Sequence, residues 1–422
     1  MRNTISGLLI FTLFLAFTSE IHAQTKQLEE WLAIKRSIRP KLSKQAFANE
    51  SLNKKQAKKV VELLGRDQKF KMIQTYGEQW QGREIRYGEY KMPFFYKIWG
   101  EEPEDGRSLF LSMHGGGGAP TAVNDKQYEN QKKLYDATMK DMEGVYLAMR
   151  APTDTWNLWH QSHIDEFINI IIQLAVIYEN VNPNKVYVLG YSAGGDGAFQ
   201  LAPRLADRWA AASMMAGHPG DASALNLRNT PFSVQVGELD SFYRRNEHAA
   251  EWELILKNLH TKDPAGYEYI VKIPKGKGHW MQLEDAVALP WMQQFTRNPI
   301  PKKVVWRQDD VMHSQFYWLE VPESMMKKSG EVVAEFNAEA NEINILENYS
   351  EELIVRLNDE MLNLDKPVTV KFNGTQIFKG TVDRNVQNVW KSLTYKGDAN
   401  LTFSASLTIV NNEKVINTKY QD

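Results

Sequence analysis

The sequence predicts an α/β fold, in which a mostly parallel sheet is preceded by a short helical segment and followed by a β-sandwich-like region. Three observations predict it. Short apolar runs alternate with longer helical stretches between residues 83 and 298. Glycine-rich turns directly follow two of these apolar runs. Past residue 299, the pattern changes to short strand-like runs separated by polar turns.

The composition is that of an ordinary globular protein. Of the 422 residues, 43% are hydrophobic and 24% are charged, which argues against a disordered or collagen-like chain. The length suggests two or three domains. The net charge is −2, whereas a nucleic-acid binder usually shows a basic excess. The chain has no cysteine, so disulfides, a cysteine nucleophile and thiolate metal sites are excluded.

Residues 1–23 have the pattern of a secretory signal peptide. Arg2 supplies the positive start, residues 5–17 form the apolar core, and Ala23 offers a small residue before Gln24. The apolar run is shorter than the roughly 20 residues that span a bilayer, and an uncleaved anchor is the alternative interpretation. We therefore expect a periplasmic or extracellular protein without stable membrane insertion after cleavage.

The helical segment covers residues 24–82. Residues 27–34 and 54–64 carry apolar side chains at helical spacing, with many lysines and glutamates between them. The segment shows no residue pattern typical of catalysis. We expect it to pack against or cap the rest of the protein.

The α/β region covers residues 83–298. Strands are expected at residues 83–88, 94–99, 109–113, 145–149, 185–189, 210–215, 232–236 and 267–273, and helices at 164–178, 193–205 and 248–259. Active sites in parallel sheets lie at the carboxyl ends of the strands. Functional residues should therefore be sought just after each strand.

The β-rich accessory region covers residues 299–422, and Pro299 and Pro301 mark the junction. Strands are expected at residues 304–307, 315–321, 342–346, 353–357, 368–372 and 401–409. Asn373-Gly374 separates two such runs and predicts a hairpin turn.

The strongest motif is Gly190-Tyr191-Ser192-Ala193-Gly194, a G-x-S-x-G sequence between an apolar strand and a helix. This context is that of a nucleophile elbow, in which glycines relieve crowding around a serine held in a strained turn. Ser192 is the predicted nucleophile. The alternative is a glycine-rich turn without catalysis.

A second glycine run, His114 to Gly118, follows the strand at residues 109–113. Glycines let backbone N–H groups approach a developing oxyanion. We expect the amides of Gly116, Gly117 and Ala193 to form the oxyanion hole and His114 to brace the loop. A flexible turn is the alternative for this run.

A serine nucleophile needs a base, and the base needs an orienting carboxylate. In the strand-to-helix architecture of this motif, the chain order is serine, acid, histidine. Asp240 follows the strand at residues 232–236, and His279 follows the strand ending at residue 273. The predicted catalytic set is therefore Ser192, Asp240 and His279.

Other residues compete for these roles. Glu238 is the rival acid, and His218 and His248 are rival histidines, although His218 precedes Asp240 and His248 is expected in a helix. His160 and His163 have H-x-x-H spacing but lack a third ligand at metal spacing, so we expect a helix start there and no metal site.

Together, HGGGG, GYSAGGDGA, GELD and GHW resemble the α/β-hydrolase superfamily. Residues 83–297 resemble its secreted esterase branch, which includes feruloyl esterases, acetylxylan esterases and polyhydroxybutyrate depolymerases, with carboxylesterase/phospholipase-like members as close relations. The resemblance implies a Ser192–Asp240–His279 triad, no metal and no organic cofactor. It covers about half of the chain.

Substrate contacts are harder to predict. Trp156, Trp159 and Trp280 lie in or near expected active-side loops and could stack on a sugar or aromatic acid, or simply pack there. Arg244 and Arg245 could meet an anionic group or form ordinary salt bridges. Phe316-Tyr317-Trp318 has the spacing of core residues, with a binding platform as the alternative.

Three functions fit these patterns. The first is a secreted serine hydrolase of carboxylic esters, with a small-molecule or polysaccharide ester as substrate. The second is a serine peptidase of the prolyl-oligopeptidase type. About 80 residues precede the α/β region, whereas that type usually carries a large β-propeller there. The third is a non-catalytic carbohydrate- or surface-binding protein, which would not need all three triad residues.

Overall fold

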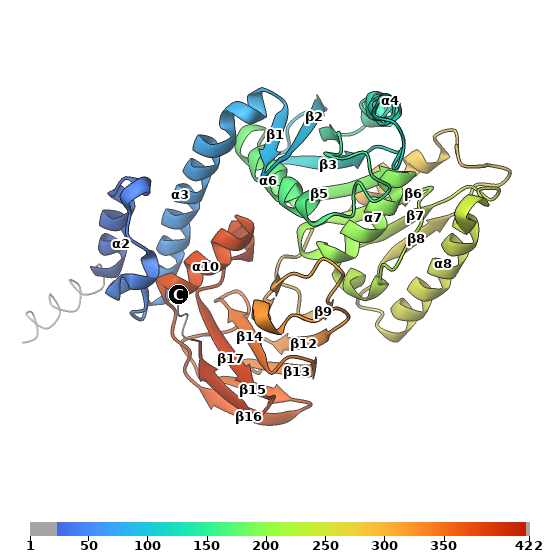
Figure 1. The fold of residues 1–422 in the computed structure, drawn as a ribbon. Coiled ribbons are helices and arrows are strands. Elements are labelled where there is room, and N and C mark those ends of the chain that lie inside the picture. Colours follow the sequence, from blue (N-terminus) through green and yellow to red (C-terminus); the bar gives the residue numbers. More distant parts are fainter. Residues whose placement is uncertain (1–22, 419–422) are drawn as a thin grey trace, which may run out of the picture.

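The computed structural model describes residues 23–418. Apart from Ala23, the predicted signal peptide lies outside the described residues. Within the described range, no helix is both long and apolar enough to cross a membrane. Figure 1 shows helices at the N-terminal end, a large mixed region around the central sheet, and β-sheets formed by the C-terminal part.

The central sheet has eight strands in the order β1-β2-β4-β3-β5-β6-β7-β8. The strands are β1 (Glu84–Tyr87), β2 (Tyr90–Trp99), β3 (Arg107–Met113), β4 (Gly144–Met149), β5 (Val181–Tyr191), β6 (Ala211–Met215), β7 (Phe232–Gln235) and β8 (Tyr269–Lys272). The pairs from β4 to β8 are parallel, while β2 is antiparallel to both of its neighbours. The predicted α/β fold with a mostly parallel sheet is confirmed, and the G-x-S-x-G motif joins the central strand β5 to a helix, as predicted.

Helices cover both faces of this sheet. They are α4 (Thr121–Gln131), α5 (Asp136–Met139), α6 (Ser162–Tyr178), α7 (Ala193–Arg204), α8 (Arg245–Lys262) and α9 (Ala288–Met292). Apolar residues of α6, α7 and α8 pack in one core, and those of α4, α5 and α9 pack in another. Strand β3 contributes side chains to both cores, because Leu109 and Leu111 point to one face of the sheet and Phe110 points to the other.

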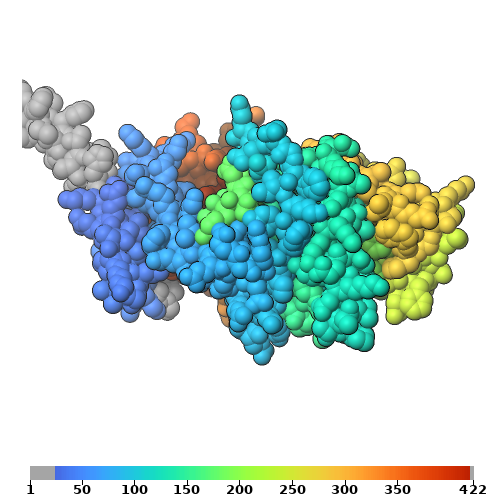
Figure 2. Space-filling view, turned by 90° about the horizontal axis from the view of Figure 1, so that it is seen from above, coloured from blue at the N-terminus to red at the C-terminus, as the bar shows by residue number. Residues whose placement is uncertain are grey.

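The N-terminal helices α2 (Ala23–Ala33) and α3 (Lys54–Gln81) form their own small core with a C-terminal helix, α10 (Val386–Lys396). A capping box starts α3: the Gln56 amide donates to Asn53 Oδ1 at 2.9 Å, and the Asn53 amide donates to Gln56 Oε1 at 2.8 Å. Seen from above, the blue N-terminal helices lie at the end of the molecule opposite the yellow segment around residues 260–290 (Figure 2).

The C-terminal region contains two five-stranded sheets, ordered β10-β11-β14-β17-β18 and β16-β15-β13-β12-β9. Their strands are β9 (Lys303–Arg307), β10 (Gln315–Phe316), β11 (Leu319–Glu320), β12 (Glu331–Asn337), β13 (Glu342–Asn348), β14 (Glu352–Leu357), β15 (Val368–Phe372), β16 (Thr375–Gly380), β17 (Ala405–Val410) and β18 (Lys414–Asn417). Apolar side chains from both sheets share one core, as in a sandwich. Asn373 and Gly374 form the predicted hairpin turn, both with positive φ.

Two strand predictions in this region were wrong. Residues 315–321 form the hairpin β10–β11, because Tyr317 has a φ of 52° and turns the chain. The strand expected at 401–409 begins only at Ala405. The aromatic run itself is buried, as expected for core residues, and the Trp318 indole donates to the Pro301 carbonyl.

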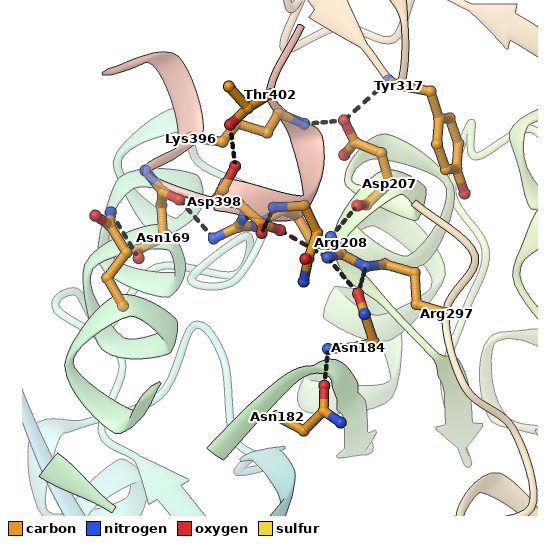
Figure 3. A network of polar contacts seen from close by, with 12 residues as sticks. Asn169, Asn182, Asn184, Asp207, Arg208, Arg297, Tyr317, Lys396, Asp398 and Thr402 are labelled. Carbon is orange, nitrogen blue, oxygen red and sulfur yellow. Dashed lines mark hydrogen bonds and ion pairs between the residues drawn. The ribbon is translucent and has the colours of Figure 1, made fainter. Parts of the chain in front are cut away.

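A buried polar network joins the α/β region to the C-terminal region (Figure 3). Arg297 and Arg208 contact Asp398 Oδ2 at 2.7 and 3.3 Å, and Lys396 pairs with Asp207. Burial alone would raise the pKa of Asp398, but the two guanidinium groups hold it below its usual value. The two regions are therefore joined by charges that have little access to water.

Candidate active site

Ser192 occupies the sharp turn between β5 and α7, with φ 57° and ψ −119°. Such a conformation is strained for a residue with a side chain. A Cβ on Gly190 would stand 2.0 Å from the Gly194 carbonyl oxygen, and one on Gly194 would stand 2.1 Å from that of Met113. Glycine is required at both positions because the strand and the helix approach so closely. The expected tight turn around the serine is present.

The structure brings Ser192, His279 and Asp240 together. His279 Nε2 lies 2.9 Å from Ser192 Oγ, and His279 Nδ1 lies 2.8 Å from Asp240 Oδ2. Because a carboxylate only accepts, the arrangement favours a proton on Nδ1 and leaves Nε2 to accept from the serine hydroxyl. Asp240 is buried, and Arg245 lies 3.7 Å from its other oxygen. This geometry suits proton abstraction from Ser192.

Tyr191 holds the loop that carries the histidine. Its hydroxyl donates to the His279 carbonyl at 2.6 Å and accepts from the Met281 amide at 3.1 Å. Sequence reasoning missed this role. Tyr191 occupies the variable position before the serine in G-x-S-x-G, where the motif does not require a hydroxyl group.

The glycine loop after β3 lies beside Ser192, with His114 at its base. Burial lowers the pKa of His114 to about 4, so its ring is neutral near pH 7. The ring bridges the loop, with Nδ1 2.6 Å from the Gly115 carbonyl oxygen and Nε2 accepting from the Ala151 amide at 3.1 Å. This placement matches the bracing role expected for His114.

The three expected oxyanion amides differ in their availability. The Gly117 amide donates to Asn124 Oδ1 at 3.0 Å, so this part of the prediction needs correction. Within the described residues, the Gly116 amide donates no hydrogen bond, and Ala193, as the first residue of α7, has no intrahelical acceptor. Gly116 and Ala193 remain as the candidate donors.

Asn124 is a site residue that sequence reasoning missed. It is fully buried and both accepts from and donates to the backbone of Gly117, each at 3.0 Å. Its amide nitrogen also donates to Asp154 at 2.8 Å, and Asp154 pairs with Arg150. The available signal in the sequence was the helical spacing of Asn124, Gln127 and Gln131, which places three polar side chains along one side of α4.

A cleft of about 840 Å³ opens beside Ser192. It is lined by residues of the glycine loop, α4 and the turn after it, and the loop after β8: Gly115, Gly116, Gln127, Asn130, Gln131, Lys133, Leu134, Tyr191, Ser192, His279, Trp280 and Leu283. Such a volume accommodates a small-molecule ester or part of a larger one.

The three tryptophans proposed as substrate contacts occupy different environments. Trp280 lines the cleft and is 51% exposed. Trp156 is 72% exposed and lies near the glycine loop, where a Cβ on Gly118 would be 3.5 Å from it. Trp159 is fully buried and its indole donates to the His114 carbonyl, so the expectation that it contacts substrate was wrong.

The rival triad residues lie elsewhere. Glu238 is exposed and accepts from the Gly276 amide. His248 lies in α8 and its ring packs against that of His218, with centroids 4.7 Å apart. His218 donates its backbone amide to Asp196 at 2.6 Å. None of the three has a hydrogen bond to Ser192 or His279 among the described residues.

The two arginines after Asp240 form salt bridges. Arg244 pairs with Glu247 and Glu251 on α8, and Arg245 is buried beside Asp240. Neither lines the cleft. The ordinary structural interpretation of both residues therefore fits better than contact with substrate.

His163 is the second residue of α6, and its ring stacks on Tyr90 with centroids 3.9 Å apart. His160 lies in the turn before the helix. Among residues 23–418, no group of three or more histidine, aspartate or glutamate side chains is placed to hold a metal ion.

Asp196, one turn into α7, is a partly buried carboxyl near the site. Burial raises its pKa to about 6, against the lowering effect of the His218 amide, Arg245 and His279. The carboxyl is therefore poised to titrate in a mildly acidic range, without lining the cleft.

No protein-family model matches the chain, and no curated protein matches its sequence. Similar solved structures include a thermostable esterase (16% identity, TM-score 0.40), acetyl xylan esterase from Aspergillus awamori (10%, 0.36) and Est1E from Butyrivibrio proteoclasticus (12%, 0.34). They cover 51%, 50% and 50% of this chain, respectively. The chain spans 62% of the thermostable esterase, 97% of the acetyl xylan esterase and 95% of Est1E.

Proposed function

We propose that the protein is a serine hydrolase that cleaves carboxylic esters through an acyl-enzyme intermediate. One observation carries the proposal: Ser192 Oγ, the His279 ring and the Asp240 carboxylate form a continuous hydrogen-bonded chain, with contacts of 2.9 and 2.8 Å. Ser192, at one end of this series of hydrogen bonds, lines an open cleft, so a substrate carbonyl can reach its hydroxyl group.

The reaction proceeds in two steps. Ser192 Oγ attacks the ester carbonyl while His279 Nε2 takes its proton, and Asp240 stabilises the resulting imidazolium. The Gly116 and Ala193 amides hold the oxyanion of the tetrahedral intermediate. The intermediate collapses, His279 protonates the departing alcohol, and an acyl group remains on Ser192. Water, activated by His279, then releases the carboxylic acid.

The test is hydrolysis of 4-nitrophenyl esters from acetate to decanoate by the purified protein and by Ser192→Ala. We expect turnover of the shorter esters by the wild type and a loss of at least about 1000-fold in the variant. Equal activity of the two proteins would refute the assignment of Ser192.

The same preparation decides between the alternatives. Cleavage of peptide 4-nitroanilides without ester turnover would favour a serine peptidase. Failure of a fluorophosphonate to label Ser192 would favour a non-catalytic binding protein. The export pattern of residues 1–23 supports an extracytoplasmic site of action, which N-terminal sequencing of the exported protein would test at Gln24.

A further inference from the structure

The cleft beside Ser192 has two chemically different walls. One wall is mostly polar and comes from α4 and the turn after it, through Gln127, Asn130 and Lys133, with Leu134 as its apolar member. The other is apolar and comes from the loop after β8, through Trp280 and Leu283. The cleft therefore offers both polar and apolar contacts to a bound ester.

Gln127 brings the polar wall next to the reacting atoms. A Cβ on Gly115 would stand 3.1 Å from Ser192 Cβ and 3.8 Å from Gln127 Oε1, so both side chains border the same small space. The Gln127 side chain is half-buried and has no hydrogen bond within the described part of the chain. Its carboxamide is therefore available to a substrate group close to the scissile bond.

Lys133 is the one formally charged side chain among the residues that line the cleft, and no carboxylate lines it. It has no ion pair with any residue between 23 and 418. Its charged sequence neighbours are already engaged, since Glu129 pairs with Lys132 and Asp136 pairs with Lys97.

The carboxylates on the loop after β8, which also lines the cleft, have partners as well. Glu284 pairs with Lys277 at 3.0 Å, and the buried Asp285 accepts from the Tyr135 hydroxyl at 2.6 Å. The polar wall of the cleft thus carries a single uncompensated positive charge.

We propose that the cleft selects an ester that bears a carboxylate, with Lys133 meeting the carboxylate, Gln127 bonding beside the scissile ester, and Trp280 and Leu283 covering the apolar part. This inference rests on the proposed ester hydrolysis and adds the charge of its substrate. An exposed ammonium among the lining residues attracts an anionic substrate during both approach and binding.

The test compares matched anionic and neutral esters. On the acyl side, mono-4-nitrophenyl succinate is compared with 4-nitrophenyl butyrate; on the alcohol side, 4-acetoxybenzoate is compared with 4-acetoxybenzamide. Each substrate is assayed with the wild type, Lys133→Gln and Lys133→Glu. Lys126→Glu is the control, because Lys126 is an exposed residue of α4 that does not line the cleft, and the substitution changes net charge equally.

For at least one pair, we expect the anionic-to-neutral ratio of kcat/KM to fall roughly fivefold to tenfold in Lys133→Gln and further in Lys133→Glu. The pair that responds shows whether the carboxylate belongs to the acid or the alcohol. The change should shrink as salt rises from about 20 to 500 mM, because screening weakens the attraction.

An unchanged ratio in Lys133→Glu, or an equal change in Lys126→Glu, would overturn the inference while leaving ester hydrolysis intact. If the wild type showed no ester hydrolysis that depends on Ser192, the proposed function would be overturned, and this inference with it. The two failures are therefore distinguishable.

Discussion

The hydroxyl of Tyr191 donates a hydrogen bond of 2.6 Å to the backbone carbonyl of His279. The residue next to the proposed nucleophile Ser192 in sequence therefore fixes the loop that carries the proposed base His279. The distance between serine and imidazole depends on this link, because His279 lies in a loop rather than in a strand or helix.

Tyr191→Phe should lower kcat for 4-nitrophenyl butyrate about tenfold with little change in KM, because a loosened base loses its alignment. Tyr187→Phe is the control. It lies on the same strand and removes one bond, of 2.8 Å, to the Phe295 carbonyl, whereas Tyr191→Phe removes two. Each lost bond should cost about 1 kcal/mol in the free energy of unfolding. Equal kcat values in the two variants would contradict the positioning role of Tyr191.

Asn124 should matter for catalysis without touching substrate. Asn124→Ala removes both bonds to the Gly117 backbone, so the glycine loop loses its support and kcat should fall about 10- to 100-fold. Asn226→Ala provides the matched control, since Asn226 makes the same two-way contact with the Arg307 backbone and does not line the cleft. Both variants should be less stable in urea, but kcat should fall only in Asn124→Ala.

Asp196 should make stability depend on pH. Its pKa is raised to about 6 by burial, so the folded protein keeps a proton that the unfolded chain has already lost. Its contribution is therefore present at low pH and is lost as pH rises from about 4 to 6. Asp196→Asn keeps the acceptor for the His218 amide and cannot ionise.

Urea denaturation at several pH values measures this effect. The variant should gain stability over the wild type as pH rises, with a limit of about 3 kcal/mol near pH 7. An advantage that is constant with pH, or that shrinks as pH rises, would contradict the ionisation of a buried carboxyl.

The buried network between the two regions should dominate stability. Asp398→Ala leaves Arg208 and Arg297 without their carboxylate and should reduce the free energy of unfolding by about 3 to 5 kcal/mol. Asp221→Ala breaks an exposed bridge of 2.9 Å to Lys328, which also joins the two regions, and should cost less than about 1 kcal/mol. Similar losses in the two variants would show that burial does not set the cost.

The sequence alone was sufficient to predict the features that depend on the order of strands and loops along the chain. Ser192, Asp240 and His279 each follow a predicted strand, and parallel strands bring their carboxyl ends to one edge. Their meeting could therefore be predicted before any distance was known. The roles of these residues and the domain boundaries at 23, 82 and 298 stay predictions.

Other features depend on partners that are distant in the chain. Gly117 was expected in the oxyanion hole, but Asn124 from α4 takes its amide. Trp156 and Trp159 have similar sequence surroundings, yet only Trp159 is buried, because it packs in the core that α6, α7 and α8 share. Local pattern could not distinguish them. Helix α10 was missed among β-strand signals, and its apolar side packs against the N-terminal helices.

The charge network around Asp398 also bears on how this chain can evolve. Modular enzymes often exchange their accessory parts by gene fusion at a linker. Here a cut near residue 299 would leave Arg208, Arg297 and Asp207 on one fragment and Lys396 and Asp398 on the other. A C-terminal region from another protein would have to supply a cation and a carboxylate at the positions of Lys396 and Asp398. The α/β and C-terminal regions are therefore expected to be inherited together. In homologues, a change of charge at one of these positions should be accompanied by a compensating change at its partner.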